Sequence, residues 1–305
     1  MPAMRPVVAV PSRLDERSFD ELAAQVAPVE GSAVVDARHL RWVDPYGMLG
    51  LLAAGAVLAS RGARPTLYLP QAAEVLSYLS RMGFWAEAER VYELSAFPPA
   101  PSAVASRRSP VLLEITPVRD HRDVHRVIAE VHERAATILR ERLHYTPLES
   151  AGFSLVLSEV CQNIIEHAGA EGWVGIQSYR WAQRLGRQVV VIAVMDLGVG
   201  FRRSLEREHA ARYGERWSDA TALEAAFIHG ASRFRDPGRG QGLKQIRAQV
   251  GRWGGKISIR SGTARIADVP DWDDAPPLET NLPPFPGAQI LVVIPEKANG
   301  GAKSP

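Results

Sequence analysis

Cysteine is nearly absent from this sequence. The only one, Cys161, lies within an apolar helical pattern, so no disulfide can form inside the chain, and the thiol is interpreted as a core side chain. A chain that folds without disulfides is typical of a reducing compartment. We therefore expect a cytoplasmic protein.

Long hydrophobic runs are also missing. The longest uncharged segment, Pro45–Ser60, falls short of the ~20 apolar residues that a membrane-spanning helix needs. Its composition predicts a buried helix instead, and no membrane association is expected. The N-terminus reaches Arg5 before any apolar segment of useful length, so we expect no secretory signal.

A strong excess of charge is lacking as well. The net charge is only +2 over 305 residues, so the molecule as a whole has no field that would draw it to nucleic acid or membrane. Hydrophobic residues make up 46% of the chain, which supports folded cores, and the length suits two domains.

Strand patterns alternate with helical patterns over residues 1–97, which predicts a small α/β layer domain. Asp44 is placed to cap the helix that begins at Pro45. The expected strands are Val7–Val10, Ala33–Asp36 and Thr66–Leu69, and the other expected helices are Ser18–Val26 and Gln71–Met82.

The segment VVDARHLRWVDPYGMLGLL, with the later helix ending in RMGFW, resembles a STAS domain, the fold of bacterial anti-sigma factor antagonists. In that family the turn before the helix reads Asp-Ser-Ser/Thr-Gly, and its first serine accepts a phosphate. Here the turn reads Asp44, Pro45, Tyr46 and Gly47. Proline has no hydroxyl, so the resemblance implies an interaction module whose Tyr46 packs or contacts a partner.

Residues 98–110 are rich in proline, serine and alanine and are interpreted as a linker. A second domain is expected over 111–296, followed by a disordered tail over 297–305. Its expected helices are 124–143, 147–169, 220–228 and 244–250. Its expected strands are 111–118, 173–179, 188–195, 256–260 and 289–294, with a proline-rich loop at 268–286.

The segment Phe153–Gly169 is the first candidate site. It has an apolar helical face, and Glu159, Asn163 and His167 follow one another at intervals of one turn. Burying such polar groups without partners is unfavourable. They therefore indicate either a ligand site or a solvated edge of the helix. Upstream, Thr146 and Glu149 form a capping-box pattern that fixes the start of the helix.

The second candidate motif is a carboxylate followed by glycines. The apolar strand before Asp196 is followed by Gly198 and Gly200. A buried aspartate is able to accept a hydrogen bond from an exocyclic amine such as that of adenine, and the glycines let the backbone approach a ligand. A simple acidic turn is the alternative, because Gly-x-Gly alone is weak evidence.

The third motif precedes a helix and contains Gly238, Gly240, Gln241, Gly242 and Leu243. Glycines at a helix start expose backbone N–H groups and the positive end of the helix dipole, which together favour phosphate. The segment lacks the Gly-Lys-Ser/Thr of a Walker loop, and it does not follow a strand in the Rossmann manner.

The segment between the last two motifs is basic. Residues 201–260 contain 13 lysine or arginine residues against 6 aspartate or glutamate residues, a favourable setting for a polyphosphate. Residues 201–238 are interpreted as a mobile cover. A nucleic-acid patch is the rival interpretation, and the lack of interleaved aromatic residues disfavours it.

The order of the three motifs resembles the GHKL ATPase superfamily over about residues 111–296, and LSEVCQNIIEHAG is most similar to bacterial anti-sigma factor kinases. The resemblance implies an α/β (α+β) protein whose second domain is a two-layer sandwich of the GHKL (Bergerat) type that binds ATP and Mg²⁺. It implies that Glu159 is the general base, Asn163 the Mg²⁺ ligand and Asp196 the adenine acceptor. The other implied cofactor-binding residues are His167, Gly198, Gly200, Gly238, Gly240, Gln241, Gly242 and Leu243.

The sequence departs from the family in three respects. Many members carry Gly-Thr before the last strand, where this chain has Gly287 and Ala288. The cover segment is unusual in length and arginine content, and the kinase-like and antagonist-like folds, which are usually separate chains, share one chain here. The first hypothesis is a partner-switching regulator, a serine/threonine protein kinase acting on a sigma factor or a separate STAS-domain antagonist. The alternative is a non-catalytic, nucleotide-responsive interaction scaffold. Dimer gating of the topoisomerase kind is disfavoured, because no transducer domain follows, and a homodimer is left open.

Overall fold

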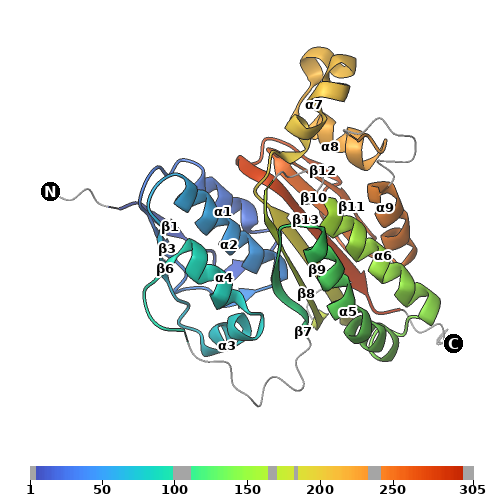
Figure 1. Cartoon of the computed structure of the whole chain (residues 1–305), viewed down its shortest axis with the longest axis horizontal. Coiled ribbons are helices and arrows are strands. Elements are labelled where there is room, and N and C mark those ends of the chain that lie inside the picture. Colours follow the sequence, from blue (N-terminus) through green and yellow to red (C-terminus); the bar gives the residue numbers. More distant parts are fainter. Residues whose placement is uncertain (1–4, 99–110, 164–169, 182–184, 233–241, 298–305) are drawn as a thin grey trace.

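The computed structural model describes residues 5–98, 111–163, 170–181, 185–232 and 242–297. A four-stranded and a seven-stranded β-sheet are present among them, and helix α2 (Pro45–Ser60) packs between the two sheets (Figure 1). The predicted α/β class is confirmed. No helix in the described ranges is both long and apolar enough to cross a membrane.

The smaller sheet is parallel and belongs to the N-terminal part, with strand order β1-β3-β5-β6. The sequence patterns predicted β1, β3, β5 and helices α1, α2 and α3 of this part, but not β2, β4, α4 or β6. The strands are β1 (Val7–Ala9), β3 (Val34–Asp36), β5 (Thr66–Tyr68) and β6 (Glu93–Leu94), while β2 (Arg13–Leu14) pairs with β4 (Trp42–Val43). The helices are α1 (Phe19–Val26), α2, α3 (Ala73–Arg81) and α4 (Phe84–Val91).

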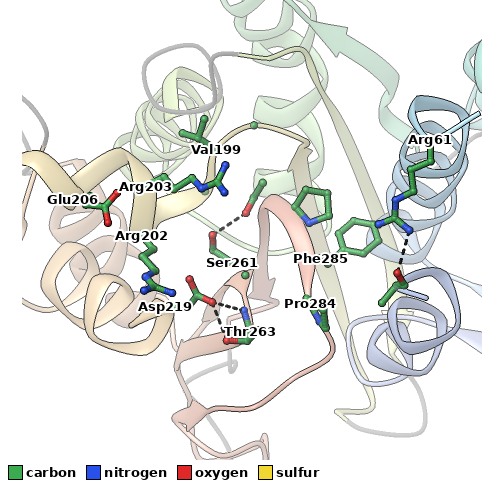
Figure 2. Close-up of a pocket in the computed structure, with 16 residues that line it drawn as sticks. Arg61, Val199, Arg202, Arg203, Glu206, Asp219, Ser261, Thr263, Pro284 and Phe285 are labelled. Carbon is green, nitrogen blue, oxygen red and sulfur yellow. Dashed lines mark hydrogen bonds between the residues drawn. The ribbon is translucent and has the colours of Figure 1, made fainter. Parts of the chain in front are cut away.

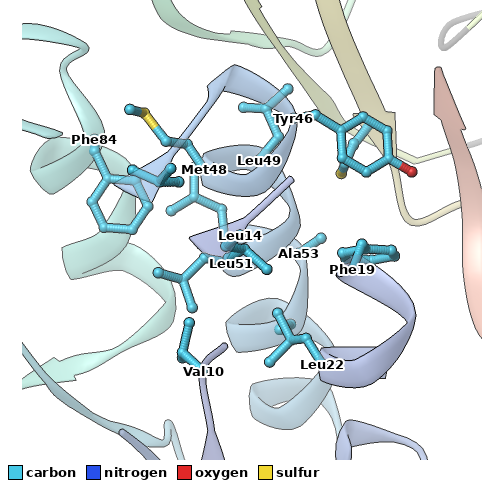
Figure 3. Close-up of a cluster of buried hydrophobic side chains, with 14 of the residues drawn as sticks. Val10, Leu14, Phe19, Leu22, Tyr46, Met48, Leu49, Leu51, Ala53 and Phe84 are labelled. Atoms are coloured by element: carbon cyan, nitrogen blue, oxygen red, sulfur yellow. The ribbon is translucent and has the colours of Figure 1, made fainter. Parts of the chain in front are cut away.

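Helix α2 begins as the sequence predicts. Asp44 Oδ1 accepts a hydrogen bond from Gly47 N at 2.8 Å, and Pro45 occupies the first turn. Nearly every residue of the helix is buried, and Figure 3 shows side chains from several elements, among them Phe19 and Phe84, gathered around it. A helix that is apolar all round is buried on all sides, which explains the long uncharged segment.

The larger sheet is antiparallel, with strand order β12-β11-β10-β13-β9-β8-β7. Helices α5, α6 and α9 cover one face, and α2 covers the other (Figure 1). The strands are β7 (Val111–Val118), β8 (Gly172–Trp181), β9 (Arg187–Asp196), β10 (Lys256–Gly262), β11 (Ala264–Asp268), β12 (Leu278–Glu279) and β13 (Phe285–Pro295). The helices are α5 (His121–Glu141), α6 (Pro147–Asn163), α7 (Gly200–Tyr213), α8 (Asp219–Phe227) and α9 (Gly242–Arg252).

Strand β9 shows why its sequence is almost wholly apolar. Ile192 and Val194 pack into the core under α5, α6 and α9, whereas Val191 and Ala193 pack into the core formed with α2. Successive side chains of a strand point to opposite faces, so a sheet covered on both faces requires apolar residues throughout.

Charged side chains also join the N-terminal part to the larger sheet. Lys256 is 1% exposed and pairs with Glu16 at 2.6 Å and with Asp273 at 3.2 Å. Arg260 is fully buried, and its Nε donates to Asp20 Oδ1 at 2.8 Å. Asp20 also pairs with Arg265. The two parts are therefore held together by buried ion pairs as well as by apolar packing.

The described part of the predicted cover is helical. Helix α8 begins with a capping box between Ser218 and Thr221, and its Leu223 and Phe227 lie in the core. Helix α7 projects away from the body of the molecule (Figure 1). The part of the segment up to Ser232 is thus built mainly from helices, with α8 anchored in the core.

The segments near the C-terminus differ from expectation in three places. Strand β11 was not predicted, and the expected loop at 268–286 contains β12 and the start of β13. Lys297 was assigned to the tail, yet its Nζ lies 2.7 Å from Glu149 Oε1. The rest of the tail, 298–305, and linker residues 99–110 lie outside the described residues.

Candidate functional site

Helix α6 carries the first motif and starts where the sequence predicts. Thr146 N donates to Glu149 Oε2 at 2.8 Å, and Glu149 N donates to Thr146 Oγ1 at 3.3 Å, which completes the capping box. Phe153 and Val160 anchor the helix in the core. Cys161 is buried, and burial raises the pKa of its thiol to about 12, so its interpretation as a core residue is confirmed.

Glu159 of α6 lies against the first residue of α9. A Cβ atom on Gly242 would lie 2.1 Å from Glu159 Oε2, so a side chain there would require the Glu159 carboxylate to move. Leu243, the next residue, is buried in the core and holds the start of α9 in place. The carboxylate of the first motif therefore meets the last glycine of the third.

Asp196 ends strand β9 and is 6% exposed. Its Oδ1 accepts hydrogen bonds from Gly198 N at 2.8 Å and Ala288 N at 3.3 Å. Within the described ranges, Oδ2 accepts none. Desolvation raises the pKa of Asp196 to about 6, although both backbone hydrogen bonds oppose the shift.

Gly287 supports this aspartate from the start of β13. Its φ is +73°, and a Cβ atom there would lie 2.0 Å from Asp196 O. Glycine is required on both counts. The Gly287-Ala288 pair, a departure from the family pattern, thus supplies the Ala288 backbone N–H that orients Asp196.

Ser261 completes this end of the site, and no sequence motif pointed to it. Its hydroxyl donates to Gly287 O at 2.7 Å and accepts from Phe201 N at 3.1 Å. Figure 2 shows it between the loop after Asp196 and the start of β13. Gly200, with φ of +70°, would place a Cβ atom 2.7 Å from this hydroxyl. Ser261 therefore ties the glycine loop to β13.

Several predicted residues have no described side chain. His167, Gly238, Gly240 and Gln241 lie outside the described residues. Asn163 is described only as the last residue of α6, one turn beyond Glu159.

A cavity of about 690 Å³ adjoins the glycine loop. Gly198 and Gly200 line it, together with Arg202 and Arg203 of α7 and Arg61 of the N-terminal part (Figure 2). Glu159, Asp196 and Leu243 do not line it. The cavity is therefore formed beside the glycine loop and not by these three residues.

The donor and acceptor set fits a nucleotide. Asp196 Oδ2 is an acceptor without a partner among the described residues, and α9 begins at a glycine against which the Glu159 carboxylate lies. A helix N-terminus attracts phosphate, and an aspartate acceptor suits an exocyclic amine.

Residues 149–276 match the family described as histidine kinase-, DNA gyrase B-, and HSP90-like ATPase. A GHKL-type ATPase domain is found here. The match contains Glu159, Asp196 and Gly242, and the fold brings the first and last of these against each other. No curated protein matches the chain. The domain supports a regulatory function that depends on ATP binding, and the sandwich fold expected from the sequence is confirmed.

Proposed function

We propose that the protein binds Mg²⁺–ATP through its GHKL-type domain and transfers a phosphoryl group to a serine or threonine of a separate protein. The observation that carries this proposal is the meeting of Glu159 with Gly242 at the start of α9. A carboxylate beside a phosphate-favouring helix end is where a base for phosphoryl transfer is needed.

Each residue then has one task. Asp196 accepts a hydrogen bond from the adenine amine through Oδ2, while Oδ1 stays bonded to the backbone of Gly198 and Ala288. Glu159 accepts the proton of the attacking hydroxyl, and Asn163 supplies a hard oxygen for the metal. Bound Mg²⁺–ATP would supply the phosphoryl group and neutralise its charge. The remaining residues assigned to the cofactor are His167, Gly198, Gly200, Gly238, Gly240, Gln241 and Leu243.

In this proposal the N-terminal part has a structural role: it packs against the larger sheet and supports the ATPase domain. The turn that resembles a phosphoacceptor site, Asp44–Gly47, is buried, with Tyr46 only 1% exposed. Pro45 lies over Gly175 of β8, where an added Cβ atom would be 3.9 Å from Pro45 Cβ. A separate kinase has no access to this turn. The substrate is therefore another chain, such as a sigma factor or a STAS-domain antagonist, and acts in the cytoplasm.

The second candidate function is a non-catalytic scaffold that responds to nucleotide. The buried, serine-free turn favours it, because the N-terminal part then has no chemistry of its own. In this version nucleotide changes only which protein is bound. It predicts nucleotide binding with no phosphorylated product.

One experiment separates the two functions. The full chain, together with proteins that co-purify with it from its native cells, is incubated with Mg²⁺ and γ-labelled ATP. We expect label on a partner serine or threonine, with Glu159→Gln retaining ATP binding and losing transfer. Full transfer by Glu159→Gln would show that the base is wrongly assigned, and binding without any labelled protein would select the scaffold.

A further inference from the structure

A second cavity, of about 360 Å³, lies between the N-terminal part and the larger sheet. Strand β4 and helix α3 form one wall, and β8 forms the other, so both parts of the chain contribute to it. None of the residues of the ATP site lines it. Its volume lies within the range of small-molecule pockets.

The lining combines aromatic rings with positive charge. Trp42, Tyr78 and Tyr179 line the cavity, and the rings of Trp42 and Tyr179 lie edge to face with centroids 6.5 Å apart. On Trp42, the guanidinium of Arg13 lies 3.6 Å from the ring centroid and fixes the indole. Aromatic walls of this kind stack planar rings.

Three arginines and one glutamate line the cavity, so its ionisable lining is positive. Arg41 and Arg180 are exposed at its mouth and pair with no carboxylate in the described ranges, and Arg81 lies further in. Arginine forks are suited to phosphate or carboxylate oxygens. The cavity therefore suits a ligand with a planar ring, which packs on the aromatic wall, and an anionic group, which binds the arginines at the mouth.

Buried polar atoms without partners point to an occupant. Gln177 is 6% exposed, and its Oε1 accepts no hydrogen bond from the described residues. The same holds for the buried hydroxyl of Tyr179 and Nε of Arg81. Buried polar atoms almost always have a hydrogen-bond partner, so three unsatisfied polar atoms around one cavity require explanation. A heteroaromatic ring with an N–H donor and ring acceptors would supply hydrogen-bond partners to this acceptor, this hydroxyl and this cation.

We propose that this cavity binds a nucleotide, meaning a heteroaromatic base carrying a phosphate, at a site distinct from the ATP site. The base lies against the aromatic wall and donates to Gln177 Oε1, and the phosphate lies at the arginines of the mouth. Because both parts of the chain line the cavity, the bound nucleotide bridges them. This proposal does not depend on phosphoryl transfer at the ATP site.

The test uses the full chain with saturating Mg²⁺–ADP, which occupies the ATP site. AMP, GMP, CMP and UMP are titrated by calorimetry to about 5 mM, the range of weak ligands. We expect at least one to bind, and Gln177→Leu and Arg180→Ala each to weaken it about tenfold or more, the scale of one lost charged or buried hydrogen bond. Arg187→Ala, an exposed arginine on the neighbouring strand, is the matched control and should leave the affinity unchanged.

The melting temperature of each variant distinguishes a loss of nucleotide binding from a folding defect. Gln177→Leu removes an unsatisfied buried group, so its melting temperature should equal or exceed that of the parent. The proposal is overturned if none of the four nucleotides binds, if Gln177→Leu binds as the parent does, or if Asp196→Asn alone removes binding. Ordered water on Gln177 and Tyr179 in a crystal soaked with all four would also overturn it.

Discussion

The carboxylate of Glu159 occupies the space that a side chain on Gly242 would need, because a Cβ atom there would lie 2.1 Å from Glu159 Oε2. The two residues are far apart in sequence and come from helices that pack on the same face of the larger sheet. Their contact joins the proposed base to the helix end proposed for the phosphates.

Gly242→Ala should therefore displace Glu159 or the start of α9 and weaken ATP binding by about tenfold or more. A tenfold change corresponds to ~1.4 kcal/mol of binding free energy. Gly251→Ala is the matched control on the same helix, because its nearest neighbour would be Asp268 Oδ2 at 4.0 Å. It should bind ATP normally and gain about 0.5–1 kcal/mol of stability from helix propensity. Calorimetric titration measures both; equal affinities for the two variants would contradict the contact.

ATP binding should weaken below pH 6. The pKa of Asp196 is raised to about 6, so the carboxylate is ionised above that pH and protonated below it. Only the ionised form offers Oδ2 purely as an acceptor. At pH 5 about one tenth of the sites are ionised, so the apparent dissociation constant should be about tenfold higher than at pH 7.5. Asp196→Asn should bind more weakly throughout and show no such step; an unchanged step in that variant would assign it to another group.

Local signals in the sequence predicted much of the fold. The capping box of Thr146 and Glu149 set the start of α6, and Asp44 with Pro45 set the start of α2, because capping depends on neighbours within one turn. The apolar run of β9 indicated a strand buried on both faces. Glu159 and Asp196 were predicted as site residues on local signals too, since each stands in a short motif, and their roles remain predictions.

Other features depend on partners that are distant in sequence. Lys256 and Arg260 gave their strand a polar appearance, yet both are buried against Glu16 and Asp20, about 240 positions earlier. Ser261 carries no motif, because its role depends on Gly287 and Phe201, which only the fold brings near. The charged strand β11 was missed because its Arg265 also finds its partner Asp20 in the N-terminal part.

Asp20→Asn should destabilise the whole molecule by about 3 kcal/mol, because it leaves the buried Arg260 with a neutral partner and Arg265 with Glu279 as its remaining carboxylate. Glu171→Gln is the matched control: this carboxylate also pairs with two arginines, Arg90 and Arg119, but all three side chains are about half exposed. It should lower the free energy of unfolding by less than about 1 kcal/mol. Urea titration followed by tryptophan fluorescence measures both, and similar losses would argue against buried pairing at Asp20.

The stability of the fold should fall between pH 6 and 8 because of Asp44. Burial raises its pKa to about 8, above the ordinary value of 3.8. The folded state therefore holds a proton that the unfolded state has released, and stability falls as the pH rises, with the loss complete above pH 8. Asp44→Asn keeps an acceptor for Gly47 N and remains neutral. Over this range it should therefore retain about 2–3 kcal/mol more of its free energy of unfolding than the parent does.

The control for this prediction is Asp44→Ala, which also lacks a titrating group but loses the helix cap. It should be about 1 kcal/mol less stable than Asp44→Asn at every pH. Urea titrations at pH 6, 7.5 and 9 give the three curves. Parallel curves for the parent and Asp44→Asn would assign the pH dependence to other groups.

Two buried tyrosines differ in the hydrogen bonding of their hydroxyl groups. Tyr46 and Tyr92 are 1% and 2% exposed, but Tyr92 donates its hydroxyl proton to Leu51 O at 2.6 Å, whereas the Tyr46 hydroxyl has no partner in the described ranges. Tyr46→Phe removes an unsatisfied polar atom and should leave stability unchanged or raise it by up to about 1 kcal/mol, while Tyr92→Phe should lower it by about 0.5–1.5 kcal/mol. Urea titration at one pH compares the two. A clear loss in Tyr46→Phe would mean that its hydroxyl has a partner, and that the turn from Asp44 to Gly47 is more than a packed brace.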